Sequence, residues 1–224
     1  MSRGILVMGE SGSGKTTSLR TLNPGKTCII ESDGKGLSWR GWKNQYAKAK
    51  KNYLEIDNAP MIESALKEIN LTMPHIKVVV IDTLNMIMVN DEISRMKERG
   101  YDKWADLATC IWGLIDIAHS LRDDLTVVCM AHTQTERDDS GYQFTRMKTS
   151  GKKLEKLCVE SKFSTVLLAK SLDGEYIFET QADKSTAKSP MGCFEKKIPN
   201  DMDFVIRKMD EYEYGECESE EKKK

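Results

Sequence analysis

The feature that most constrains the fold is a glycine-rich loop near the N-terminus. Residues 9–16 read Gly-Glu-Ser-Gly-Ser-Gly-Lys-Thr, which matches the pattern G-x-x-x-x-G-K-[ST], and they directly follow the apolar run of residues 4–8. Such a loop works as a turn from a strand into a helix, where backbone N–H groups and the positive end of the helix face a phosphate. We therefore predict a strand, a phosphate loop over residues 9–16 and a first helix over residues 17–22, which ends at Asn23-Pro24-Gly25.

The residue types in this loop assign roles to its members. Glycines let the backbone approach a ligand closely and take positive φ at little steric cost. Lys15 is expected to reach the β- and γ-phosphates of a nucleoside triphosphate, and the hydroxyl of Thr16 to ligate Mg²⁺. We therefore predict ATP and Mg²⁺ as cofactors, with these nucleotide-binding residues: Gly9, Glu10, Ser11, Gly12, Ser13, Gly14, Lys15, Thr16 and Thr17.

The rest of the chain alternates apolar runs with helical patterns. Its 224 residues suit one α/β domain with a mainly parallel central sheet flanked by helices. We predict strands over residues 27–31, 77–82 and 125–131, helices over 60–72, most of 84–121 and 151–161, and a C-terminal antiparallel hairpin from runs 165–169 and 176–179. The polar stretch 135–150 is predicted to be a loop. The domain is expected to span residues 1–209, followed by a disordered acidic and lysine-rich tail over 210–224.

Composition argues against several classes of protein. Lys and Arg number 34 and Asp and Glu 35, a net charge of −1, so nucleic-acid binding would need a local basic patch. The six cysteines include no C-x-x-C pair, which argues against a metal cluster or a disulfide framework. No apolar stretch approaches the length of a membrane span, so we expect a cytoplasmic protein with no membrane partner.

Acidic residues follow two of the predicted strands. Asp82 ends a buried apolar run, and a carboxylate at the end of a strand beside the phosphate-loop strand is expected to hold Mg²⁺. Hydrolysis also needs a group that orients or deprotonates water. Glu31 and Asp33, at the end of the 27–31 strand, are the candidates, and they lie on the same side because side chains alternate along a strand. The sequence leaves the choice between these two carboxylates open.

A third polar group, His132, stands at the end of the strand over residues 125–131. Ligands of open α/β sheets gather at the carboxyl ends of the strands. We therefore expect His132 to contact the γ-phosphate and to pass its presence on to the loop that follows. The alternative is a histidine that only satisfies its own hydrogen bonds at a strand end.

Taken in order, these features resemble the ATPase core of RecA-family recombinases. More closely, the chain resembles the minimal RecA-like, AAA-type nucleotide-binding proteins of bacteriophages, which include ATP-dependent single-strand annealing proteins. The closer likeness spans about residues 3–205 and rests on these motifs: Gly9–Thr16, Asp33–Ser38, Val80–Thr83, Ala131–Thr133, Ser150–Lys153 and Ala187–Pro190. It implies a RecA-like P-loop NTPase fold.

The resemblance also implies residue roles. Asp33 would stand where RecA-like proteins keep their water-activating carboxylate, which is usually Glu, so Glu31 stays an alternative. His132 would take the sensor position, with Gln134 as its alternative. Lys184 would match the lysine that a neighbouring subunit directs toward the γ-phosphate, which implies a homo-oligomer with ATP at its subunit interfaces.

Two regions are candidates for contact with single-stranded DNA. Residues 135–150 would be the DNA-contacting loop of the resemblance, and the basic residues in and after it are Arg146, Lys148, Lys152 and Lys153. The segment over residues 39–53 interleaves five basic residues with aromatic ones and offers an alternative surface. The alternative without DNA binding, for each region, is a solvated charged face whose aromatic side chains pack on the core.

The resemblance predicts a DNA-stimulated ATPase that binds single-stranded DNA and promotes annealing or strand exchange in phage recombination or replication. A single-strand-binding protein is a candidate partner. Two other functions stay open. One is a nucleotide-dependent switch or loader that acts on a protein partner. The other is a P-loop small-molecule kinase, although the arginine-rich lid usual in such enzymes is matched here only by Arg137 and Arg146.

Overall fold

The apolar runs of the sequence become the parallel strands of one central sheet in a computed structural model, which describes residues 1–98, 102–137, 139–150 and 158–215. Along the sheet the strand order is β3-β2-β4-β5-β1-β7-β8-β9, and β6 pairs with β5 outside this path. Strands β3 to β7 in this order are parallel, whereas β8 and β9 are antiparallel. The strands are β1 (Arg3–Gly9), β2 (Thr27–Glu31), β3 (Tyr53–Glu55), β4 (Val78–Asp82), β5 (Thr126–Arg137), β6 (Gln143–Met147), β7 (Thr165–Leu172), β8 (Glu175–Glu179) and β9 (Lys197–Pro199). The predicted class is confirmed: α/β, mainly parallel, with antiparallel strands near the C-terminus, as in a P-loop NTPase.

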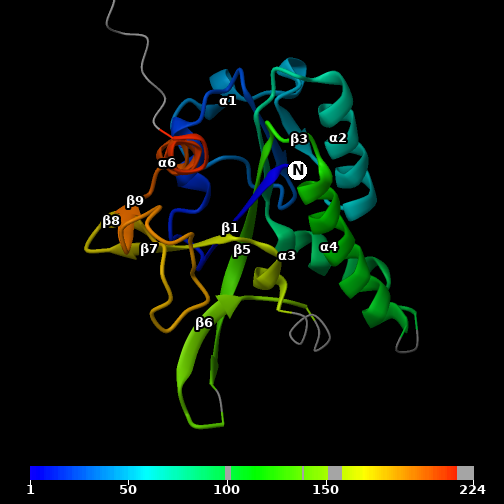
Figure 1. Cartoon of the computed structure of the whole chain (residues 1–224). Coiled ribbons are helices and arrows are strands. Elements are labelled where there is room, and N and C mark those ends of the chain that lie inside the picture. The colour runs from blue at the N-terminus through cyan, green and yellow to red at the C-terminus, as the bar shows by residue number, and fades with distance from the viewer. Residues whose placement is uncertain (99–101, 138, 151–157, 216–224) are drawn as a thin grey trace, which may run out of the picture.

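Helices cover both faces of this sheet (Figure 1). The helices α2 (Ala59–Thr72), α3 (Leu84–Ser94) and α4 (Asp102–Ser120) pack on one face. On the other face lie the short 3-10 helix η1 (Thr16–Thr21) and α6 (Met202–Tyr214), with α1 (Trp42–Gln45) at its edge. Because side chains alternate along a strand, Leu6 and Met8 of β1 join the first core and Ile5 and Val7 join the second.

The strand that leads into the phosphate loop has different neighbours from those expected. We expected the strand ending at Asp82 to lie beside β1, and this is wrong, because β5 lies between β4 and β1. Residues 126–131 of β5 are buried on both faces, so this strand needs a partner at each side. The carboxyl ends of these parallel strands still meet at one edge of the sheet, and Asp82 reaches the phosphate loop from there.

The first helix begins one residue earlier than predicted and is a 3-10 helix, not an α-helix. Four of the six residues of η1 are Ser or Thr, and their hydroxyls compete for backbone carbonyls: Ser18 Oγ donates to Lys15 O at 2.6 Å. Such residues have modest helix propensity. Instead, α6 supports η1 from outside, because Arg20 donates to Asn200 O at 3.0 Å and Thr21 Oγ1 donates to Asp201 Oδ1 at 2.8 Å.

The polar stretch over residues 135–150 is a β-hairpin and not a loop. Strand β5 continues to Arg137 and pairs antiparallel with β6, from Thr133 opposite Met147 to Arg137 opposite Gln143. Threonines and Phe144 in this stretch suit strands, and Gly141 takes a φ of 85° in the turn. The polar composition led to the wrong prediction of a loop, because this hairpin extends beyond the buried part of the sheet, where strand residues can be polar. We call residues 133–147 the β5–β6 hairpin.

Most remaining elements match their predicted ranges. The helices α2, α3 and α4 and the β7–β8 hairpin confirm the predictions over 60–72, 84–121 and 165–179. Of the helix predicted over 151–161, residues 151–157 lie outside the described part, and the rest contributes only the 3-10 helix η3 (Val159–Lys162). The segment over residues 39–53 contains α1 and the 3-10 helix η2 (Lys48–Lys50), and it runs into β3.

The C-terminal helix crosses the boundary expected at residue 209. Helix α6 begins at an Asp201 cap, whose Oδ1 accepts from Phe204 N at 2.9 Å, and runs to Tyr214. Arg3 of β1 bonds Asp210 at 2.8 Å and Glu213 at 2.6 Å, so acidic residues expected in a tail instead pair with the first strand. Residues 216–224 lie outside the described part.

Candidate functional site

The phosphate loop packs so closely that only glycine fits at two of its positions. A Cβ on Gly9 would lie 2.4 Å from Ser13 Oγ and 2.8 Å from Ala169 O. Gly14 has a φ of 91°, and a Cβ there would lie 2.7 Å from Cδ1 of Tyr176 in β8. Close contacts with Ser13, with Ala169 of β7 and with Tyr176 of β8 therefore favour glycine at these two positions.

Lys15 is buried inside the loop. Its Nζ donates to Gly9 O and to Glu10 O, both at 2.8 Å, and only 6% of the residue is exposed. Burial lowers the pKa of Lys15 to about 8. An ammonium held this close to the loop backbone is placed where an anion on the loop would meet it.

Thr16, which begins η1 after the phosphate loop, meets Asp82, the last residue of β4, at the end of the sheet. The two residues meet although β1 and β4 are not neighbours. Thr16 Oγ1 donates to Asp82 Oδ2 at 2.8 Å, and Asp82 is 5% exposed. Burial raises the pKa of Asp82 to about 6, and the Thr16 hydrogen bond opposes this shift. A hydroxyl and a carboxylate are hard oxygen ligands of the kind that Mg²⁺ prefers, so the pair fits the predicted metal.

Glu31 lies next to this pair, because the register of β2 and β4 sets it opposite Asp82. It is 2% exposed, its Oε1 accepts from Lys35 N at 2.9 Å, and its Oε2 is buried without a hydrogen-bond partner. Burial and the hydrogen bond with Asp33 raise the pKa of Glu31 to about 7. A carboxyl with a pKa near neutrality can exchange a proton at physiological pH.

Asp33 differs from Glu31 in environment and in charge. Burial acts to raise its pKa, but hydrogen bonds from Glu31 and Lys35 outweigh burial and hold the pKa of Asp33 below its ordinary value. Lys35 Nζ bonds Asp33 Oδ2 at 2.9 Å. The two candidates are therefore a neutralisable buried acid and an ionised acid paired with a lysine.

Lys35 is a residue that the sequence reasoning did not assign to the site. The loop that carries it is joined to η1, because Thr17 Oγ1 and Ser38 Oγ lie 3.0 Å apart. Its charge lowers the pKa of both Lys15 and His132, which indicates that it lies close to the phosphate loop. The sequence feature that could have assigned Lys35 to the site is its position between two glycines in the Asp33–Ser38 motif.

His132 also reaches the loop, as predicted from its strand end. Its Nδ1 lies 3.5 Å from Lys15 Nζ, and burial and the Lys15 charge lower the pKa of His132. The alternative sensor, Gln134, donates instead to Glu136 Oε1 at 2.7 Å, within the β5–β6 hairpin. Of the two, His132 is the side chain that the structure brings to Lys15.

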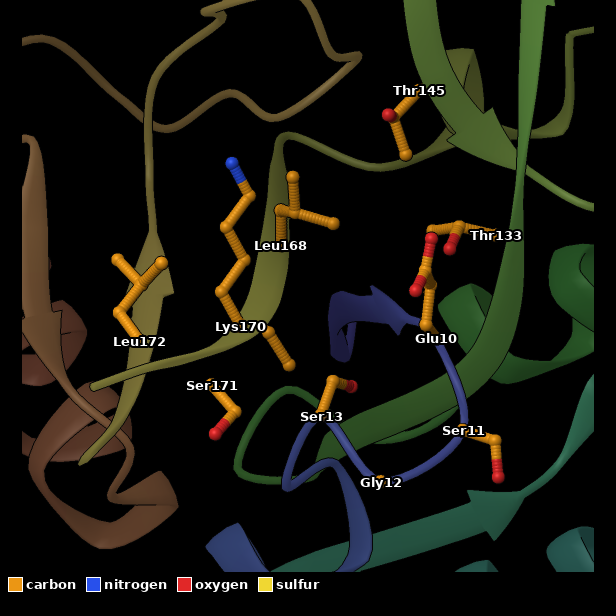
Figure 2. A pocket seen from close by; sticks show the side chains of 11 residues that line it. Glu10, Ser11, Gly12, Ser13, Thr133, Thr145, Leu168, Lys170, Ser171 and Leu172 are labelled. Carbon is orange, nitrogen blue, oxygen red and sulfur yellow. The ribbon is translucent and has the colours of Figure 1, made fainter. Parts of the chain in front are cut away.

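A cavity of about 280 Å³ adjoins the phosphate loop. Figure 2 shows Glu10, Ser11, Gly12 and Ser13 along one side of it and the end of β7, with Lys170 and Leu172, along another. Thr133 and Thr145 of the β5–β6 hairpin line the remaining side. The loop is therefore open to a ligand between β7 and the hairpin.

The predicted basic residues outside this centre are dispersed. The Arg146 side chain is 11% exposed and lies between Glu136 and Glu160, at 3.4 and 3.6 Å, so its charge is used inside the protein. Lys148 is exposed at the base of the hairpin, and Lys152 and Lys153 lie outside the described residues. Lys184 is exposed in the segment after β8, and its carbonyl accepts from Thr145 N at 2.7 Å.

Two comparisons bear on this site. A family model described as "AAA domain" matches residues 1–191, a span that includes every candidate residue described above. A comparison with curated proteins returns no match. Within the described residues, no helix is both long and apolar enough to cross a bilayer.

Proposed function

Because the chain belongs to the AAA domain family, we propose that it is a Mg²⁺-dependent ATPase of RecA-like type that binds single-stranded DNA and promotes annealing or strand exchange. Family membership indicates nucleotide binding and hydrolysis. The choice of ATP, the DNA partner, the phage setting and the cytoplasmic location go further and belong to the proposal. So does a homo-oligomer in which Lys184 acts on a neighbouring subunit's nucleotide.

The contact that carries the proposal is the 2.8 Å hydrogen bond between Thr16 Oγ1 and Asp82 Oδ2. It joins the phosphate loop to the acid of a strand two places away in the sheet, and it is the pair of groups that a phosphate-bound Mg²⁺ requires. When bound, Mg²⁺ would neutralise negative charge on the phosphates. Thr16 and Asp82 would hold it, and Lys15 would bind the β- and γ-phosphates.

The remaining polar groups fit the roles around a hydrolysed phosphate. Glu31 can accept a proton from water, since its pKa is about 7, while Asp33 can orient water as an ionised acceptor. His132, within 3.5 Å of Lys15, is placed to respond to the terminal phosphate. We propose Glu31 as the base and Asp33 as its positioning partner, which reverses the roles that the resemblance alone implied.

The proposed DNA contact rests on charge and exposure. The basic segment, residues 39–53, contains five Lys and Arg and no acidic residue. Lys148 supplies a further exposed cation at the base of the hairpin, and Lys152 and Lys153 follow it in the sequence. Phosphate contacts of this kind bind without sequence preference and weaken as salt is added.

The first test is ATP hydrolysis with and without single-stranded DNA at low salt. We expect DNA to stimulate hydrolysis, and Lys15→Ala to reduce it by at least about 100-fold, as the loss of one phosphate-binding charge does in other enzymes. Lys184→Ala should lower hydrolysis only when subunits are concentrated enough to assemble. Hydrolysis that DNA leaves unchanged would refute the DNA-dependent part of the proposal.

One observation favours a second function, that of a nucleotide-dependent switch acting on a protein partner. The β5–β6 hairpin lies beside the phosphate loop, but its Arg146 is paired internally with acidic residues. A hairpin without a free cluster of cations suits a protein surface better than a DNA backbone. Capture of a defined protein by the ATP-bound chain, with no measurable DNA affinity, would establish this function instead.

A further inference from the structure

The first turn of α3 contains one buried side-chain amide, that of Asn85. It stands three residues after Asp82, among apolar neighbours, and is 8% exposed. A buried amide is stable only when its donor and acceptor groups are paired. The partners of Asn85 therefore show what this position does.

Both ends of the Asn85 amide bond the base of the β5–β6 hairpin. Its Oδ1 accepts from His132 N at 2.6 Å, and its Nδ2 donates to Lys148 O at 2.7 Å. Lys148 N in turn donates to His132 O at 2.7 Å. One side chain thus holds the outgoing and the returning strand of the hairpin where they leave the sheet.

The backbone that carries Asn85 is fixed to the proposed catalytic groups. Thr83 N donates to Ser32 Oγ at 2.8 Å, and Ser32 Oγ donates to Thr83 O at 2.8 Å, which ties the start of α3 to the end of β2 beside Glu31. On the other side, the ring of His132 lies 3.5 Å from Lys15 Nζ. A change in position of either Asp82 or the phosphate loop can therefore be transmitted to Asn85 through these hydrogen bonds and close contacts.

We propose that Asn85 is a positioning residue that couples nucleotide at the phosphate loop to the conformation of the β5–β6 hairpin. The inference rests on the proposed nucleotide binding and adds to it a route of regulation. The hairpin extends four residues beyond its base pair Thr133–Met147, about 13 Å of strand, so a small rotation at the base moves the tip further. Coupling through one such bonded element is expected to change a local equilibrium about tenfold.

Hydrogen exchange of the hairpin amides tests this coupling directly. In the full chain, Mg²⁺ with a non-hydrolysable ATP analogue should slow exchange of the β6 amides about tenfold. Asn85→Leu removes both bonds and should abolish that slowing, while nucleotide affinity, measured separately, changes less than about threefold. Asn85→Asp keeps an acceptor for His132 N but sets a carboxylate oxygen against Lys148 O, so it should abolish the slowing through the second bond alone.

Two controls decide between coupling and general damage. Amides of the β7–β8 hairpin should exchange at the same rate in all variants, and Asn90→Leu, on the same helix, should keep the nucleotide effect. Should Asn85→Leu fold poorly, the milder Asn85→Asp decides the question. The coupling is refuted if nucleotide leaves the exchange rate of the β6 amides unchanged in the wild type. It is also refuted if nucleotide still slows this exchange in both Asn85 variants. A wild-type chain that binds no nucleotide at all refutes the proposed function, and the coupling with it.

Discussion

The β5–β6 hairpin and the basic segment (residues 39–53) lie at opposite ends of the molecule. They differ in net charge and in how they are bonded to the candidate site. Figure 1 shows β6 at one end and α1, which belongs to the basic segment, at the other. Residues 133–149 hold three acidic and three basic residues, whereas residues 39–53 hold five basic residues and no acidic one. The hairpin has no net charge and is bonded to the candidate site through His132 and Lys148, whereas the basic segment carries a net positive charge.

The aromatic residues of the two regions differ in the same way. Tyr46 and Tyr53 of the basic segment are 1% and 4% exposed and belong to the core, so they offer no face for an unstacked base. Tyr142 at the hairpin is 49% exposed. The difference teaches that net positive charge and the bonds that join His132 to Asn85 lie in separate parts of this fold. The predictions below test that division, from the largest expected effect to the smallest.

Glu160 holds the base of the hairpin, so its loss should cost the most stability. Its Oε1 accepts from Met147 N at 2.9 Å, and its side chain, 3% exposed, faces Arg146. We expect Glu160→Ala to lower the free energy of unfolding by about 3 kcal/mol, because it removes one of the two carboxylates that face the buried Arg146 and leaves Met147 N without its acceptor. Urea denaturation measures this. Glu55→Ala, which breaks an exposed pair with Lys48, should change it by less than about 0.5 kcal/mol.

Charge removal in the basic segment should weaken DNA binding without affecting nucleotide binding. For Arg40, Lys43, Lys50 and Lys51 changed together to Gln, we expect affinity for single-stranded DNA to fall about 100-fold at low salt. The slope of log affinity against log salt should become less steep by about 3, at roughly 0.7 per phosphate contact. Fluorescence anisotropy across a salt series checks both. A loss of less than about threefold would remove this segment from the DNA-binding surface.

The pH dependence of hydrolysis should identify the base at the end of β2. With the pKa of Glu31 at about 7, its deprotonated fraction rises about tenfold from pH 6 to pH 8, and kcat should rise with it. Glu31→Gln should flatten the profile. Since the pKa of Asp33 lies below its ordinary value, a base role for Asp33 would give a flat profile in the unmodified chain.

The smallest effect is expected at Lys148, the exposed cation at the base of the hairpin. Lys148→Gln removes one charge and leaves its backbone bonds to His132 and Asn85 intact. We expect about a threefold loss of DNA affinity and a salt slope less steep by about 0.7. A loss as large as that of the fourfold variant would show that the hairpin, and not the basic segment, binds the strand.

Much of the fold followed from local patterns. The apolar runs over 27–31, 77–82 and 125–131 became β2, β4 and the buried part of β5, because continuous apolar residues suit strands covered on both faces. The strands β3 and β9 were not predicted, since three residues are too few to show a period. The tail beyond 209 was misjudged because charge alone did not reveal the pairing of Asp210 and Glu213 with Arg3.

By itself, the sequence determined the phosphate loop, since its pattern of glycines, lysine and threonine directly after an apolar run is specific to a strand-to-helix turn that binds phosphate. It also indicated that Glu31, Asp82 and His132 stand at or just after the ends of apolar runs, which a parallel sheet gathers at one edge. Only the tertiary structure decided that β5 lies between β1 and β4, that Arg146 is paired internally, and that Asn85 joins His132 to Lys148. These facts depend on contacts between residues far apart in the chain. Hydrophobic periodicity and short motifs describe neighbouring residues only, so they do not indicate which distant groups will meet.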